Sequence, residues 1–142
     1  MDDDTSSIRA FIKRFVDVTD MPPEDADLFK ALDIYGDDAD EFIVEFGQRF
    51  DVDVGGYLWY FHTREECWNP GALFFKPPNR RVTPIPISVS LLRKAQLEKH
   101  WPITYPVHAL PKRRWDILIS QVVCLFPLAL VGLGLILKFV LH

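Results

Sequence analysis

The sequence predicts an all-α protein in which a small helical bundle is followed by one C-terminal transmembrane helix. Apolar residues recur at helical spacing in the first hundred residues, and a run of 21 residues, 117–137, carries no charge. As a helix this run would be about 31 Å long, which matches the hydrocarbon thickness of a bilayer. We therefore expect a cytosolic helical domain at residues 1–101, a Pro-rich basic linker at 102–114 and a membrane anchor at 115–142.

The first helix of the domain is predicted from apolar periodicity. Residues 8, 11, 12, 15 and 16 are apolar and share one face of a helix that starts near Thr5 or Ser6. Proline cannot continue a helix, so we expect this helix to end before Pro22 and Pro23. An acidic segment at 24–32 is expected to add a further turn or two.

The strongest helical pattern runs from about Asp38 to Phe50, with Gly36 before it as a turn. Asp38 and Glu41 have the spacing of a capping box, so we expect Asp38 to cap this helix. A second capping box, Thr63 to Glu66, predicts a short helix. Residues 88–101 predict the last helix of the domain.

Charge is distributed unevenly along the chain. Residues 1–70 carry 6 Lys and Arg against 18 Asp and Glu, whereas residues 71–142 carry 10 against 2. The acidic half would repel nucleic-acid phosphates, so we expect no nucleic-acid binding and a protein partner with a basic surface. The basic half is typical of a segment that approaches an anionic membrane.

The residues that flank the uncharged run predict its orientation. Lys112, Arg113 and Arg114 precede it, and Trp115 stands where an interfacial aromatic residue belongs. By the positive-inside rule, these cations place the N-terminal domain in the cytoplasm. The chain begins with Met and three aspartates, unlike the basic start of a signal peptide. We therefore expect a single-pass, tail-anchored protein in contact with the lipid bilayer.

Motifs of known catalytic and metal sites do not occur in the sequence. It contains no phosphate-binding loop with lysine, no HExxH, no GxSxG and no CxxC. His62 and Cys67 could act as a base and a nucleophile, but a lone cysteine beside Trp68 more often packs against its neighbours. We therefore predict neither enzymatic activity nor a bound metal or cofactor.

Acidic residues crowd the start of the helix at 38–50. Helix dipole effects stabilise carboxylates in a first turn, but the repulsion between neighbouring carboxylates opposes that gain. Fold stability alone therefore does not account for the cluster. We predict that its members bind a basic partner surface; they are Asp37, Asp40, Glu41 and Glu45.

Residues 32–52 resemble the signature of acyl carrier proteins, in which a helix opens after a serine and ends at a phenylalanine. Aligning that phenylalanine with Phe50 places Gly36 where carriers have the serine that bears phosphopantetheine. The resemblance thus implies an acyl-carrier-like bundle, and the missing hydroxyl implies that carrier chemistry is lost.

A wider resemblance covers about residues 5–101. The turn at 36–39, the pair Tyr60 and Phe61 followed by Glu65, and a segment from Pro86 to Trp101 are similar to a bacterial domain-of-unknown-function family, numbered 1493. That family implies no activity. Its bacterial origin implies that the membrane is the cell inner membrane.

Three functions are compatible with these features. The leading hypothesis is a non-enzymatic, membrane-tethered interaction module that uses the acidic helix. A small regulatory or immunity-type protein that acts through its transmembrane helix is the second. The third, a divergent acyl or peptidyl carrier, would need a modified serine, and Ser88 and Ser90 are the mid-chain candidates.

Overall fold

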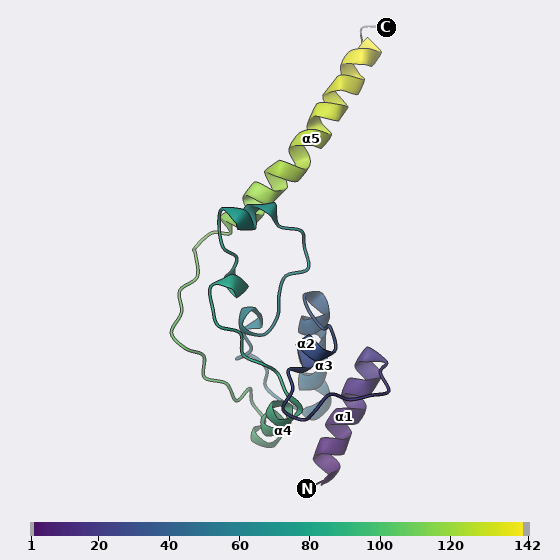
Figure 1. Cartoon of the computed structure of the whole chain (residues 1–142), viewed down its shortest axis with the longest axis vertical. Helices are drawn as coiled ribbons and strands as arrows, with labels where there is room; N and C mark the ends of the chain where they lie inside the picture. Colours follow the sequence, from purple (N-terminus) through teal and green to yellow (C-terminus); the bar gives the residue numbers. More distant parts are fainter. Residues whose placement is uncertain (1, 141–142) are drawn as a thin grey trace.

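The computed structural model describes residues 2–140, and within them the protein is all-α, as predicted. Five α-helices and three short 3-10 helices follow one another, and no strand occurs in this range. Figure 1 shows two parts: a bundle that contains α1 to α4, and the long helix α5, which projects away from it. The likeness of the bundle to an acyl carrier protein stays a prediction.

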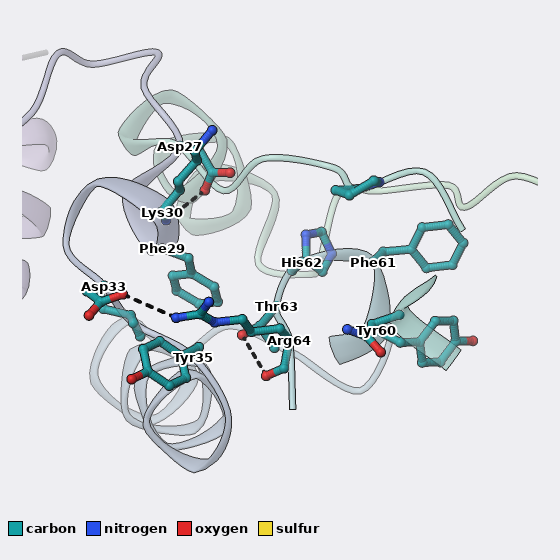
Figure 2. A pocket seen from close by; sticks show the side chains of 13 residues that line it. Asp27, Phe29, Lys30, Asp33, Tyr35, Tyr60, Phe61, His62, Thr63 and Arg64 are labelled. Carbon is teal, nitrogen blue, oxygen red and sulfur yellow. Dashed lines mark hydrogen bonds and ion pairs between the residues drawn. The ribbon is translucent and has the colours of Figure 1, made fainter. Parts of the chain in front are cut away.

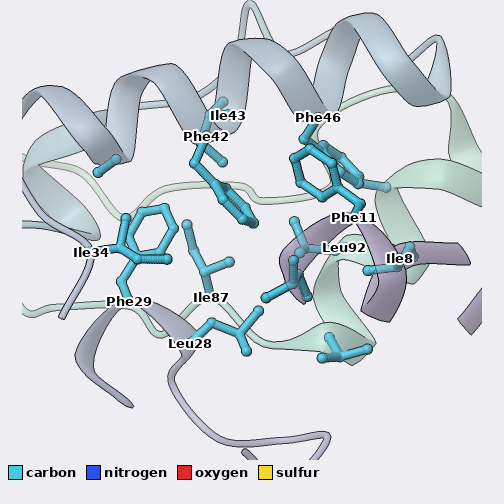
Figure 3. Packing of buried hydrophobic residues seen from close by; sticks show 14 of the residues in the cluster. Ile8, Phe11, Leu28, Phe29, Ile34, Phe42, Ile43, Phe46, Ile87 and Leu92 are labelled. Atoms are coloured by element: carbon cyan, nitrogen blue, oxygen red, sulfur yellow. The ribbon is translucent and has the colours of Figure 1, made fainter. Parts of the chain in front are cut away.

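The core of the bundle is built on phenylalanines from α1 (Asp2–Val16) and α3 (Asp37–Phe50). The ring of Phe11 lies 5.1 Å from that of Phe42, 6.2 Å from Phe46 and 5.7 Å from Phe50, in tilted and edge-on arrangements that aromatic pairs favour. Figure 3 shows Phe11, Phe42 and Phe46 in the space between the helices. This contact fixes α1 against α3.

Two shorter helices close the core. Helix α2 (Leu28–Ala31) begins after Asp27, whose side chain accepts a hydrogen bond from the Lys30 amide. Helix α4 (Val89–Glu98) begins after Ser88, whose hydroxyl accepts from the Leu91 amide. Both caps satisfy N–H groups that a helix start leaves without partners. Leu28 and Leu92 then become fully buried in the core.

The predicted capping role of Asp38 is wrong. Gly36 is the N-cap residue of α3, and it makes no side-chain hydrogen bond there. Gly36 has a φ of +57°, and a Cβ at this position would lie 2.1 Å from the Glu66 side chain. Both facts favour glycine, so the helix starts from a glycine turn and Asp38 lies inside its first turn.

The predicted helix at Thr63–Glu66 is also absent. The chain instead forms a 3-10 helix one step earlier, η1 (Trp59–Phe61), and then runs without regular structure through the predicted capping box. Carbonyl groups on either side of Thr63 accept hydrogen bonds from distant amides: Phe61 from Ile85 at 2.6 Å, and Arg64 from Gly36 at 3.1 Å. These tertiary bonds hold the segment open and override its local helical signal.

Helix α5 (Trp115–Val140) is the one helix of the described residues that is long and apolar enough to cross a membrane. Little of its surface is buried against the rest of the chain. The remaining 3-10 helices are η2 (Pro70–Leu73), which lies against the start of α5, and η3 (Pro78–Arg80). Residues 102–110 run without helix along the domain to the start of α5 (Figure 1).

A candidate acidic docking groove

An open groove of about 480 Å³ lies between the end of α1, the turn after α2 and the first turns of α3. We call it the acidic groove. It is lined by Arg14, Phe15, Val16, Leu32, Asp33, Ile34, Asp38, Glu41 and Glu45.

Helical spacing explains why three carboxylates of α3 face this groove. Asp38, Glu41 and Glu45 are separated by three and four residues, so they lie on one face of the helix. A neighbouring face of the helix carries Phe42 and Phe46, which are fully buried in the core. Burial of that apolar face therefore turns the acidic side chains outward, toward the end of α1.

The groove carries more negative charge than its cations balance. Arg14 forms an ion pair with Glu45, and the carboxylate of Asp33 lies 3.6 Å from the guanidinium of Arg64. Within residues 2–140, no cation pairs with Asp38 or Glu41. The side chains of all four paired residues are also substantially exposed, so these ion pairs are weak.

Most of the groove's accessible surface is polar, and apolar side chains contribute a smaller part of it. Ile34 is buried, and Phe15, Val16 and Leu32 are partly buried against the core. The lining suits a partner segment that is mainly basic and carries a few apolar residues.

Two of the four predicted partner-binding residues line the groove, and two do not. Glu41 and Glu45 line the groove, whereas Asp37 and Asp40 are exposed residues of α3 that do not line it. Asp40 is exposed overall, but partial burial of its carboxyl group, and then the charge of Asp37, raises its pKa. The charge of Asp40 in turn helps to raise the pKa of Tyr57, after the larger effect of burial.

Two acidic residues of the groove, Asp33 and Asp38, are not in the predicted set. The spacing of Asp38 to Glu41 and Glu45 already places it on the same face of the helix. Asp33 precedes α3 and has a φ of +54°. Only the folded path of the turn between α2 and α3 brings Asp33 to the rim, so no local sequence pattern could have found it.

A second cavity, of about 320 Å³, lies between α2, the turn that follows it and the segment around η1. Figure 2 shows Arg64 reaching from that segment toward Asp33 and Tyr35. The guanidinium carbon of Arg64 lies 4.3 Å from the centre of the Tyr35 ring, a cation–π contact. Lys30 and Asp27 add one charge of each sign to the lining. This mixture of charges selects neither an anion nor a cation.

His62 in the wall of this second cavity is committed to the fold. Its Nδ1 lies 2.8 Å from the Ile85 carbonyl oxygen, and its Nε2 lies 2.7 Å from the Tyr105 hydroxyl. A carbonyl only accepts, so Nδ1 carries the proton and Nε2 accepts from Tyr105. Burial lowers the pKa of His62 and so favours this neutral form. Both ring nitrogens thus have partners other than Cys67, whose side chain is exposed.

The predicted membrane-flanking residues divide into two groups. Lys112, Arg113 and Trp115 are exposed, as an interfacial role requires. Arg114 is half-buried, and its guanidinium lies 2.7 Å from Glu65 and 2.6 Å from Asp116. Its hydrogen bond with Asp116 is the main reason that the pKa of Arg114 is raised. Arg114 therefore joins the domain to α5 as well as adding to the basic flank.

No group of three or more His, Cys, Asp or Glu side chains in the described part of the chain is arranged to hold a metal ion. Comparisons with known protein families, with curated proteins and with solved structures found no match.

Proposed function

We propose that the protein is a non-enzymatic interaction module, tethered to the bacterial inner membrane by α5 with its domain in the cytoplasm. In this proposal the acidic groove binds a basic, amphipathic segment of a partner protein near the membrane. The observation that carries the proposal is the pair Asp38 and Glu41. These carboxylates line the acidic groove and have no cationic partner among the described residues.

The cost of keeping these charges together supports a role in binding. Carboxylates one turn apart on a helix repel one another by a few tenths of a kcal/mol. A basic partner would relieve this repulsion and also speed association, because opposite charges steer the encounter. Tethering would add to the effect, since confinement to the membrane raises the effective concentration of the domain near membrane-bound partners.

The test is affinity capture from detergent-solubilised membranes with the full-length protein as bait. The groove variant is Asp38→Asn with Glu41→Gln, and the matched control is Asp37→Asn with Asp40→Asn. Both remove two charges from the first turn and a half of the same helix, but only the first changes the groove.

Exposed ion pairs contribute about 0.2–1 kcal/mol each, so loss of two should weaken capture roughly 2- to 30-fold. The control should retain capture close to that of the unmodified protein. Raising the salt concentration should weaken capture by the unmodified protein and by the control, because the pairs are exposed to screening. Equal capture by the two variants would contradict the proposal that the groove is the binding site.

A further inference from the structure

We propose that the loop around η2 is a second membrane contact, in which Trp68, Leu73 and Phe74 insert into the bilayer interface beside the first turn of α5. The inference rests on the proposed membrane tether, because it takes α5 as the span. It goes beyond that proposal because a second contact would fix the orientation of the domain relative to the membrane surface.

Hydrogen bonds clamp the loop to the start of α5. The Asn69 amide nitrogen donates to the Asp116 carboxylate at 2.8 Å, and the Gly71 backbone amide donates to the Ser120 hydroxyl at 3.0 Å. The Ser120 hydroxyl in turn donates at 2.7 Å to the side-chain oxygen of Asn69. Asp116 is 2% exposed in this junction. The loop is therefore held against α5 by a connected polar network.

Gly71 brings the two backbones together. A Cβ on Gly71 would lie 1.9 Å from the carbonyl oxygen of Asp116, a distance that no side chain tolerates. Because Asp116 and Ser120 are one helical turn apart, η2 is placed beside the turn where the uncharged run begins. In Figure 1, η2 lies at the base of α5, at the end of the domain opposite the α1–α4 bundle.

Large apolar side chains of this loop are exposed, and so is one in the first turn of α5. Trp68 is 74% exposed, Leu73 84% and Phe74 73%. Trp115, in the first turn of α5, is 46% exposed. Exposure of large apolar side chains to water is unfavourable, and several of them in one short loop suggest a contact with a partner or a membrane. Tryptophan and phenylalanine are the side chains that favour the interface of a bilayer.

Basic residues lie close in sequence to the loop and to the start of α5. Lys76, Arg80 and Arg81 follow it, Lys112 and Arg113 lie just before α5, and all five are exposed. Cations near an anionic leaflet strengthen membrane attachment. Aromatic residues and cations beside the first turn of a span fit a lipid surface. A protein partner fits less well, because lipid headgroups would occupy the same position.

The test measures the depth of spin labels in the full-length protein reconstituted into bilayers that contain anionic lipid. Cys67 and Cys124 are first replaced by serine, and single cysteines are then introduced by Leu73→Cys, Phe74→Cys, Phe126→Cys or Leu97→Cys. Leu97 is a matched control, because it is 63% exposed on α4, away from the loop. Each label is tested for collision with oxygen, which concentrates in lipid, and with a water-soluble nickel chelate.

The proposal predicts that labels at 73 and 74 collide more with oxygen than with nickel, as the label at 126 does, while the label at 97 shows the reverse. Labels at 73 and 74 that behave like the one at 97, with 126 still in lipid, would overturn the loop insertion and leave the tether intact. Labels at 73 and 74 shielded from both reagents would indicate protein contact and also overturn it. A label at 126 exposed to nickel would overturn the tether and the loop together.

Discussion

The Tyr105 hydroxyl is the hub on which the packing of residues 102–110 against the domain depends. It accepts hydrogen bonds from the Leu58 amide at 3.1 Å and from the Trp101 indole at 2.8 Å, and it donates to His62. Tyr105→Phe removes this oxygen and leaves three polar groups without a partner. A buried group left unpaired costs about 1–3 kcal/mol, so with partial access of water we expect a loss of about 3–5 kcal/mol of unfolding free energy.

Tyr60→Phe is the matched control. The Tyr60 hydroxyl makes one hydrogen bond, at 2.7 Å to Nε2 of the exposed His108, and its loss should cost about 0.5–1.5 kcal/mol. Both variants delete one hydroxyl from a tyrosine. The assay is urea unfolding of the full-length protein in detergent, followed by tryptophan fluorescence, because Trp101 is buried beside Tyr105. If Tyr105→Phe and Tyr60→Phe lower the unfolding free energy by amounts that differ by less than about 1 kcal/mol, the Tyr105 hydroxyl does not have the central role described here.

Three further predictions follow from charges and from the span. Burial lowers the pKa of His62 below 6.5, so the unfolded chain binds a proton more readily than the folded chain does. The unfolding free energy should therefore fall as the pH drops below 6.5. His62→Gln should flatten this pH dependence, as measured by urea titrations at several pH values. The pKa of Asp40 is raised, so its ionised form destabilises the fold at neutral pH; Asp40→Asn should raise Tm at pH 7 and lose that advantage below the ordinary carboxyl pKa of 3.8. Scrambling residues 121–137 while keeping their composition should leave partner capture intact, whereas a protein that acts through its span would lose it.

Strong periodicity made the long elements predictable. The pattern from 38 to 50 predicted α3 to within one residue at its start, because the buried face of a helix leaves a regular trace in sequence. The helix predicted at Thr63–Glu66 does not form, because distant contacts override its local signal. A capping box is a local signal, and the hydrogen bonds of the Phe61 and Arg64 carbonyls with Ile85 and Gly36 come from distant parts of the chain.

The candidate site was predictable only in part. The acidity of α3 was visible in the sequence, and so was the shared face of Glu41 and Glu45. The rest of the groove lining was not, because it combines the end of α1 with the turn after α2. The clamp between Asn69, Gly71 and Ser120 joins residues about 50 positions apart, and no spacing rule connects them.

The path of the chain at Gly36 bears on the carrier alternative. A serine at this position would need a φ of +57° and would meet the Glu66 side chain, so the fold disfavours the residue that carrier chemistry requires here. This observation favours the interaction module over a carrier modified at the usual place. Ser88, the alternative candidate, uses its hydroxyl to cap α4.

Photo-crosslinking in intact cells tests the central claim most directly. A photoreactive amino acid is placed at Val16, in the groove, or at Leu97, exposed on α4 outside it. If a partner docks in the acidic groove, position 16 gives a discrete adduct with another protein and position 97 gives none. The adduct should be lost when Asp38→Asn and Glu41→Gln are added. The same adducts from both positions, or an adduct from position 16 that survives removal of the two charges, would contradict the claim that the acidic groove is the docking site.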